Sequence, residues 1–294
     1  ALPYAHERRS MRALSGKKEP EQVADALIWH PDVRRMLLTQ KAIAEGGRAM
    51  VYGAAKIADQ MFNAVTEGDQ AKYKKYDDEL GFYTPILKGF LTEMGLEAAN
   101  LGIQVFGGHG YIGEHGMEQI ARDARISTLY EGTTGIQALD LLGRKVLLNT
   151  KGKCVRDFSA TMLRLIKPYS LQRTPMGQMM RTLARRTAQW NVLTTLIMLR
   201  ASKDREQVGS SSVDYLMYSG FVMMAYFWAL QASKAAELFA SGKGKESNDF
   251  YTAKIQTAEF YFARLLPRAD GHYSAALAPT SAVMQMPQEL FQMA

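Results

Sequence analysis

The apolar residues of this chain recur at the spacing of an α-helix, and this periodicity limits the folds that it can adopt. Pro31 suits the first turn of a long helix, and Asp32 suits the positive end of its dipole. From there to Val65 the apolar repeat is Val33, Met36, Leu37, Ile43, Met50, Val51 and Ile57. Because the alternation typical of strands is not sustained anywhere, the sequence predicts an all-α fold.

Further helices are predicted on both sides of this one. The end of a helix is expected at 2–14, with a polar loop at 15–25, and further helices at 78–106 and 133–148. The charged stretch 67–79 is predicted to be a loop or the fraying end of a helix. In the second half, helices are expected at 150–166, 177–200, 212–241 and 249–266, with loops at Pro168, 173–175 and 242–245. We therefore predict a four-helix bundle in residues 1–150 and a second, bundle-like helical extension in residues 151–294.

The composition sets further limits. With 294 residues, 47% of them hydrophobic, the chain can bury a large core and could hold two domains. Its single cysteine, Cys154, excludes an intramolecular disulfide and fits a reducing compartment. The five histidines are scattered, so no metal site is predicted. No signal or transit peptide is visible, and a bacterial-type cytoplasmic location is expected rather than the mitochondrial matrix.

The positive charge of the chain lies in its second half. Residues 1–150 carry 18 Lys and Arg against 19 Asp and Glu, whereas residues 151–294 carry 18 against 10. Two basic clusters stand out in that half: Lys151, Lys153 and Arg156, and Arg181, Arg185 and Arg186. They could bind a polyanion, but a solvated basic face is the preferred interpretation.

One uncharged stretch, 215–232, is almost long enough to span a membrane. It is bounded by Asp214 and Lys234, and its small residues fall on one broad face: Ser219, Gly220, Ala225 and Ala229. Small residues permit close packing between helices. A buried helix inside a bundle is therefore preferred over a membrane span.

The stretch from Gln104 to Gln137 combines a glycine-rich turn with an acidic loop. Glycines at 107, 108, 110 and 113 let a backbone approach a ligand closely and present N–H groups to it. Glu131 follows in a short loop. Thr134 and Gln137 have the spacing of a capping box, which makes Thr134 the expected N-cap and places Glu131 near the positive end of a helix dipole. By themselves, these residues also fit a plain turn and a solvated acid.

Several elements of this stretch resemble, in order and register, the signature of the acyl-CoA dehydrogenase family. They are Gln104, Gly107–Gly108–His109–Gly110–Tyr111, Arg122–Asp123–Ala124–Arg125, Tyr130–Glu131–Gly132–Thr133 and Ile136–Gln137. The resemblance covers about residues 1–150 and implies the helical C-terminal domain of those enzymes. Residues 151–294 resemble the extra helical region of a larger-subunit branch. Arg122 and Asp123 are expected to form an internal ion pair that shapes the loop before Glu131.

The resemblance implies a reaction and a role for each residue of the loop. The reaction is the FAD-dependent dehydrogenation of a fatty or related acyl-CoA to the trans-2-enoyl-CoA, as in β-oxidation. Glu131 would be the catalytic base that takes the α proton while the flavin N5 accepts the β hydride. Its N–H would bind the thioester carbonyl together with a ribityl hydroxyl. Tyr130 would line the acyl cavity, Gly132 would admit substrate and flavin, and Thr133 would contact the phosphate side of the flavin.

The family also implies a flavin contact from a neighbouring subunit. Its motif Glu-Arg-x-x-Phe-Gly corresponds here to residues 7–12, ERRSMR. Met11 and Arg12 stand where the motif has Phe-Gly, so the local ring stacking of the family is in doubt here. Arg9 or Arg12 could share the role of the motif's arginine. The residue that matches the pyrophosphate-binding arginine is Arg8, and the rest of the contact would come from Gln104, Gly107 and Gly108.

Partners follow from the same resemblance. Because the chain begins in what reads as a helix, it is expected to be part of a longer polypeptide whose N-terminal part completes the enzyme. A homodimer or dimer of dimers and an electron-transfer flavoprotein are implied, and this chain alone is expected to be inactive and to bind FAD weakly. Neither nucleic acid nor membrane is an expected partner. The alternative is a non-metabolic relative whose basic C-terminal region contacts DNA; the intact Tyr130–Thr133 loop favours the enzyme.

Overall fold

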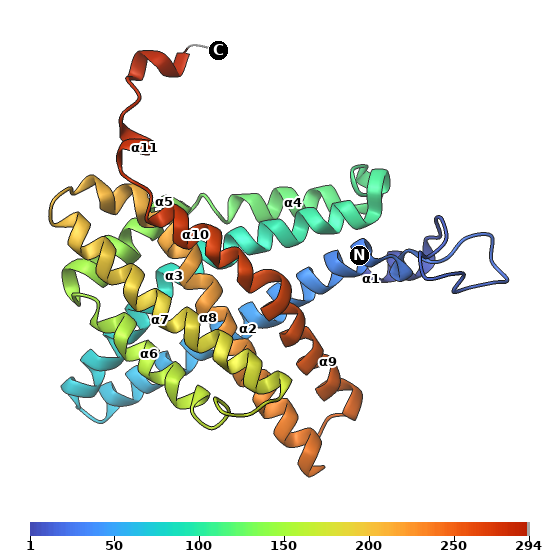
Figure 1. Cartoon of the computed structure of the whole chain (residues 1–294), viewed down its shortest axis with the longest axis horizontal. Coiled ribbons are helices and arrows are strands. Elements are labelled where there is room, and N and C mark those ends of the chain that lie inside the picture. Colours follow the sequence, from blue (N-terminus) through green and yellow to red (C-terminus); the bar gives the residue numbers. More distant parts are fainter. Residues whose placement is uncertain (293–294) are drawn as a thin grey trace.

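A computed structural model describes residues 1–292 of the protein, which are built from helices (Figure 1). In that range there is no strand, so the predicted all-α fold is confirmed. The first half forms α1 (Leu2–Glu7), η1 (Leu27–Trp29), α2 (Pro31–Thr66), α3 (Gln70–Phe106), η2 (Gly107–Gly110), η3 (Gly113–His115), α4 (Met117–Ile126), α5 (Thr134–Leu139) and the π-helix η4 (Asp140–Asn149). The second half forms α6 (Lys153–Ile166), α7 (Pro175–Ala201), α8 (Glu206–Ser241), α9 (Asn248–Phe260), η5 (Tyr261–Leu265), η6 (Leu266–Arg268), α10 (Ala269–Ala276), α11 (Ser281–Met284) and η7 (Gln288–Gln292).

Three predicted helix boundaries are wrong. The helix expected at 212–241 begins at Glu206. The first helix ends at Glu7 rather than at residue 14, because Arg8 is extended and its carbonyl accepts a hydrogen bond from the Leu27 N–H at 2.9 Å. The charged stretch 67–79 belongs mostly to α3, which begins at Gln70. Asp69 caps this helix by accepting from the Lys72 N–H at 2.9 Å. This end of the helix is mostly charged, and Tyr73 and Tyr76 alone are too few to show a helical repeat of apolar residues, so the periodicity did not detect it.

Other helix ends follow the sequence signals. Pro31 begins α2, as expected. Thr174 caps α7, since its hydroxyl accepts from the Gly177 N–H at 3.1 Å, and Pro175 is the first helical residue. Gly242, with φ +65°, ends α8 in the left-handed conformation.

The uncharged stretch 215–232 lies in α8, which runs through the middle of the molecule (Figure 1). This helix packs against helices of both halves of the chain: α2, α3, α5, α7, α9 and α10. Trp228 is fully buried, and its Nε1 donates to the Ala42 carbonyl at 3.1 Å. Gly220 packs against Phe90 so closely that a Cβ would lie 2.1 Å from the ring. None of the helices in residues 1–292 is long and apolar enough to cross a membrane.

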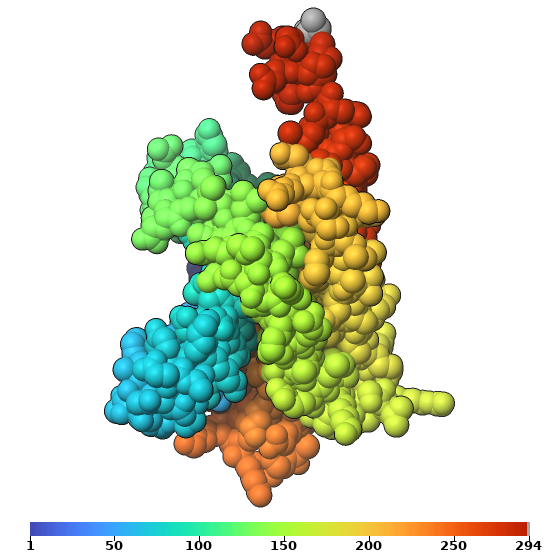
Figure 2. All heavy atoms as spheres, turned by 90° about the vertical axis from the view of Figure 1, so that its left-hand side faces the viewer, coloured from blue at the N-terminus to red at the C-terminus, as the bar shows by residue number. Residues whose placement is uncertain are grey.

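A single hydrophobic cluster extends from Ala42 in α2 to Ala276 in α10. It contains side chains from both sides of residue 150, because α8 fills the space between α2, α3 and α5. The division into a bundle and an extension stays a prediction. After α10 the chain leaves this core, and Figures 1 and 2 show the last segment standing clear of the body.

One residue of the second basic cluster, Arg186, is buried, whereas Arg181 and Arg185 are exposed. Arg186 is only 2% exposed, and its guanidinium forms an ion pair with Asp270 in α10. For Arg186, both sequence interpretations, a polyanion contact and a solvated face, are therefore wrong. Arg181 and Arg156 also make internal contacts, each donating to a backbone carbonyl of its own segment. These arginines join loops and helices of the C-terminal half.

Candidate active site

Glu131 lies in a short loop between α4 and α5. Its backbone φ is +53°, a left-handed conformation that costs a residue with a Cβ roughly 1–2 kcal/mol. Its side chain is exposed on this chain, and its carbonyl accepts a hydrogen bond from Gln137 Nε2 at 3.1 Å. Strained residues persist only where their surroundings hold them, and they concentrate at functional sites.

The start of α5 leaves backbone donors free beside Glu131. The N–H groups of Glu131, Gly132 and Thr133 donate no backbone hydrogen bond within residues 1–292. Thr133 is the N-cap, because its hydroxyl accepts from the Ile136 N–H at 3.4 Å. The prediction of Thr134 as N-cap is wrong by one residue, since that hydroxyl donates to a carboxylate of α3 instead. Free N–H groups at a helix start can stabilise an anion or a polarised carbonyl oxygen.

Gly132 and Gln137 maintain the shape of this loop. Gly132 has φ +95°, and a Cβ on it would lie 2.8 Å from Gln137 Nε2. A larger residue at 132 would therefore displace the amide that binds the Glu131 carbonyl. Tyr130 is 53% exposed, and Lys88 Nζ lies 5.4 Å from the centre of its ring. Tyr130 thus faces outward from the loop and is available to a ligand.

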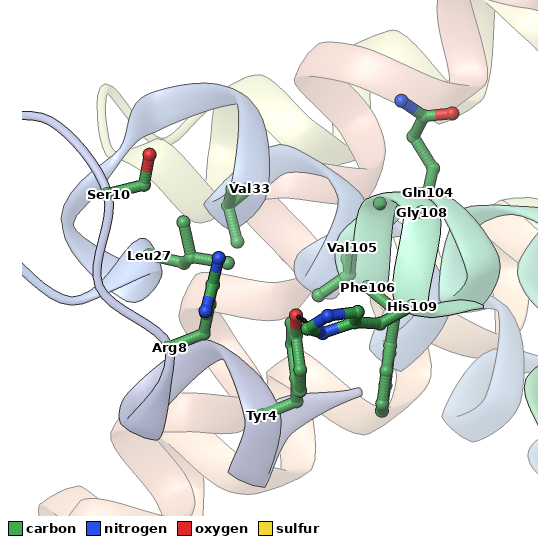
Figure 3. Close-up of a pocket in the computed structure, with 11 residues that line it drawn as sticks. Tyr4, Arg8, Ser10, Leu27, Val33, Gln104, Val105, Phe106, Gly108 and His109 are labelled. Carbon is green, nitrogen blue, oxygen red and sulfur yellow. Dashed lines mark hydrogen bonds between the residues drawn. The ribbon is translucent and has the colours of Figure 1, made fainter. Parts of the chain in front are cut away.

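A second group of predicted residues surrounds a pocket of about 440 Å³ (Figure 3). Tyr4 and His109 close one side of it, with the Tyr4 hydroxyl 2.8 Å from His109 Nδ1. Tyr4 also stacks on Phe106 with ring centres 4.1 Å apart. Among the lining residues are all four that were predicted to contact a flavin across subunits: Arg8, Gln104, Gly107 and Gly108. Residues almost one hundred positions apart are thus brought to one surface hollow.

Only one of the three neighbouring arginines lines this pocket. Arg9 pairs with Glu19 instead. Arg12 donates to Asp25 at 3.2 Å, and Asp25 is buried and also accepts from the Ala13 N–H at 2.8 Å. That backbone N–H, with Arg12, lowers the pKa of Asp25 and keeps the loop 9–26 folded around a carboxylate. Arg9 and Arg12 are therefore held by this loop, and Arg8 remains for the pocket.

The glycine turn contains residues with different reasons to be glycine. A Cβ on Gly110 would lie 2.5 Å from the Ile103 carbonyl oxygen, so packing within the chain requires glycine. A Cβ on Gly108 would meet nothing within 4 Å, and its φ is not positive. Nothing in residues 1–292 requires glycine at 108, which fits close approach by a ligand. Met11, where the family motif has Phe, is 78% exposed and stacks on nothing in the pocket.

The expected ion pair between Arg122 and Asp123 is wrong. Both side chains are exposed, and Asp123 accepts instead from Gln119 Nε2 at 2.7 Å. Consecutive residues of a helix point in different directions, whereas residues four apart share a face. The loop before Glu131 is shaped instead by Arg125, which donates to the Thr128 hydroxyl at 2.5 Å.

The two groups of predicted residues lie at opposite ends of α4 (Figure 1). The glycine turn precedes this helix and the Glu131 loop follows it. A helix of this length is about 15 Å long. One chain therefore presents two separate surfaces rather than one closed site.

Two family models match consecutive segments of the sequence. The model described as acyl-CoA dehydrogenase, C-terminal domain, matches residues 5–147. The model described as acetyl-CoA dehydrogenase C-terminal like matches residues 155–287. The chain belongs to the acyl-CoA dehydrogenase family.

Relatives of this acyl-CoA dehydrogenase family chain match it over almost its whole length. A 3-methylmercaptopropionyl-CoA dehydrogenase of Ruegeria pomeroyi is 35% identical over 274 residues, which are 93% of this chain and 45% of the relative. A broad-specificity linear acyl-CoA dehydrogenase of Mycobacterium tuberculosis is 30% identical over 273 residues, 91% of this chain and 44% of the relative. The chain thus spans about half the length of the curated relatives that it matches.

Solved structures share the fold of this family member. An acyl-CoA dehydrogenase from Bacillus anthracis, solved with FAD, superposes with a TM-score of 0.67 at 16% identity, covering 98% of this chain and 46% of that one. ACDH-11 of Caenorhabditis elegans, solved with C11-CoA, gives 0.65 at 18% identity, covering 90% and 39%. At these identities the likeness shows the fold alone.

Sequence reasoning missed two residues outside the motifs and the role of one inside them. Tyr4 shapes the pocket together with His109 of the glycine turn, and Lys88 contacts the loop from α3. A helical repeat of apolar residues predicts α3, and a lysine between them carries no local sign of its contact with the loop. A larger pocket of about 690 Å³ lies between α3 and α6, but no predicted site residue lines it.

Proposed function

We propose that this chain supplies the base-bearing loop of a flavin-dependent acyl-CoA dehydrogenase that converts a fatty or related acyl-CoA to the trans-2-enoyl-CoA. The observation that carries the proposal is the conformation of Glu131, a carboxylate on a left-handed loop followed by free backbone N–H groups. A base beside hydrogen-bond donors suits removal of a proton next to a thioester carbonyl. FAD, when bound, accepts the β hydride.

Glu131 acts in this proposal through two groups. Its carboxylate takes the proton from the α-carbon, and its N–H donates to the thioester oxygen, on which negative charge develops. Tyr130 forms part of the acyl cavity, and Gly132 keeps the backbone clear of the substrate. Thr133, the N-cap of α5, contacts the phosphate side of the flavin. Because Glu131 is exposed on this chain, other parts of the enzyme complete the water-free site that the reaction needs.

In this proposal, the Arg8 pocket contacts the flavin of a neighbouring copy of the chain. Arg8 supplies a positive charge for the flavin pyrophosphate, and Gln104 with the open Gly108 forms the opposite wall. The separation of this pocket from Glu131 by α4 supports a site shared between two copies. A homodimer or a dimer of dimers follows, in which each copy contributes one surface to its own flavin and one to its neighbour's.

Names of relatives support the choice of substrate and electron acceptor. Relatives are named for butyryl-CoA, linear acyl-CoA and 3-methylmercaptopropionyl-CoA. A relative that is 28% identical over 131 residues is named as a subunit of a caffeyl-CoA reductase–Etf complex. We infer a saturated acyl-CoA substrate, an electron-transfer flavoprotein as acceptor and a cytoplasmic location. For the DNA-binding alternative, Arg186 is buried and Arg181 and Arg156 donate to carbonyls of their own chain, which leaves fewer cations of the two basic clusters for a polyanion.

The proposal is tested by the reductive half-reaction. A saturated acyl-CoA, added without oxygen to the flavin-loaded enzyme that contains this chain, is expected to bleach the flavin. The product should be two hydrogens lighter by mass spectrometry, with a trans-2 double bond. If acyl-CoAs from four to sixteen carbons all leave the flavin spectrum unchanged, the proposed function is wrong.

Retention of FAD tests the pocket separately. Replacing Arg8 with alanine removes one charge-assisted contact, worth roughly 1.5–3 kcal/mol, so FAD affinity should fall about 10- to 100-fold. The measurement is flavin released on dilution or gel filtration. Arg173, an exposed arginine in the loop before α7, is the matched control, and its alanine variant should keep FAD. Equal retention by both variants would remove Arg8 from the site.

A further inference from the structure

Two charged side chains of α3 point to the segment that carries Glu131. Lys88 is half-buried, and its Nζ donates to the Ser127 carbonyl at 2.6 Å and lies 5.4 Å from the centre of the Tyr130 ring. Glu93 is also half-buried and accepts a hydrogen bond from the Thr134 hydroxyl. One contact therefore lies before Glu131 in the sequence and the other after it.

These contacts replace the ion pairs that half-buried charges usually form. Neither Lys88 nor Glu93 takes part in a salt bridge within residues 1–292, although both have lost part of their hydration. Partly desolvated charges are costly unless hydrogen-bonded, so each depends on the loop for its partner. The loop in turn receives a fixed contact on either side of its strained residue.

We propose that Lys88 and Glu93 are positioning residues for Glu131. They hold residues 127–134 against α3, and the loop between the two contacts keeps the left-handed φ of +53° at Glu131. Gln137 completes the support by donating to the Glu131 carbonyl at 3.1 Å. A left-handed glutamate would relax without such contacts, because the conformation is unfavourable for a residue with a Cβ. The inference rests on the proposed role of Glu131 as base.

The contacts of Lys88 and Glu93 predict which kinetic constant their loss should change. Neither Lys88 nor Glu93 bonds to the Glu131 side chain, so their loss leaves the base chemically intact and changes where it is held. Misplacement of a reacting group by about 1 Å can cost about a hundredfold in rate. The rate of flavin reduction should therefore fall while the affinity for acyl-CoA changes little.

The experiment compares Lys88→Met, Lys88→Arg and Thr134→Val in the flavin-loaded enzyme. Methionine removes the ammonium but keeps an unbranched side chain, arginine keeps a cationic donor, and valine removes only the hydroxyl that binds Glu93. Lys88→Met and Thr134→Val should each reduce flavin about 10- to 100-fold more slowly at saturating acyl-CoA, with KM within about threefold of wild type. Lys88→Arg should recover most of the rate. The control is Lys56→Met, on an exposed lysine of α2.

Amide hydrogen exchange supplies a readout that does not depend on turnover. Residues 127–137 should exchange faster in Lys88→Met and Thr134→Val, while α2 keeps its wild-type protection. Unchanged exchange in this segment, or an arginine variant as slow as the methionine variant, would overturn the proposal. If wild type itself fails to reduce its flavin, the proposed function fails, and the exchange result still decides whether α3 holds the loop.

Discussion

Replacing Glu131 with glutamine is expected to slow flavin reduction by acyl-CoA at least about a thousandfold. Glutamine has almost the same size and keeps the backbone N–H, so the thioester can still be bound, but its amide cannot accept the α proton. Loss of a general base typically costs 10²- to 10⁴-fold, and a thousandfold loss corresponds to about 4 kcal/mol of transition-state stabilisation. The affinity for a 2-enoyl-CoA should remain near that of the wild type, and it can be measured from the change that the ligand causes in the flavin spectrum.

Two variants make this result specific. Glu114, an exposed acid in η3, is the matched control, and Glu114→Gln should reduce its flavin at the wild-type rate. Glu131→Asp keeps the carboxylate but withdraws it by one methylene, so an intermediate rate is expected from misplacement alone. The rates would be followed by anaerobic stopped-flow absorbance of the oxidised flavin. If Glu131→Gln kept a tenth or more of the wild-type rate, the base would have to be sought elsewhere.

Removing Asp270 should destabilise the fold more than removing a surface acid. Arg186 in α7 is 2% exposed and donates through Nη2 to Asp270 Oδ2 in α10 at 2.6 Å. Asp270→Ala would leave that guanidinium buried without its carboxylate, and breaking a fully buried pair costs roughly 3–5 kcal/mol. Because Asp270 is itself 58% exposed and water partly replaces it, about 2–3 kcal/mol is expected. Urea unfolding at neutral pH gives the difference directly.

A matched surface pair and a pH series test whether the lost ion pair causes the destabilisation in Asp270→Ala. Lys153 and Asp157 are 69% and 61% exposed, so Asp157→Ala should cost no more than about 0.5 kcal/mol. The hydrogen bond from Arg186 lowers the pKa of Asp270, so its stabilisation is present above the unfolded pKa of about 3.9. The difference between wild type and Asp270→Ala should shrink as the pH falls below that value. An Asp270→Ala loss no larger than that of Asp157→Ala would contradict the argument.

The helices could be predicted from the sequence to the extent that they bury a periodic face. Pro31 and the repeat after it gave α2, and the uncharged stretch 215–232 gave a buried helix in α8. The first turns of α3 were missed because they are mostly charged, with Tyr76 packed on the core, and are supported by the cap at Asp69 and the pair Lys74–Asp78. An exposed helix end leaves little trace in hydrophobic periodicity.

The candidate site, too, could be predicted only in part from the sequence. The loop at Glu131 and the pocket residue Arg8 were both found through local motifs, in which neighbouring residues share one role. The N-cap was placed one residue late because Thr133 and Thr134 are both suitable, and the choice depends on Glu93 accepting from Thr134. That contact, and the contact of Lys88, joins residues about forty positions apart. No local pattern contains such information.

By itself, the sequence determined that this chain is helical, that it belongs with the acyl-CoA dehydrogenases, and that Glu131 and Arg8 are its most informative residues. Only the tertiary structure decided which charges act inside the chain. It buried Arg186 against Asp270, used Arg12 to hold a loop, and left Arg8 at a pocket. The reason is physical: a charged residue has the same local signature whether solvated or paired, and its partner is chosen by the packing of helices that are distant in sequence.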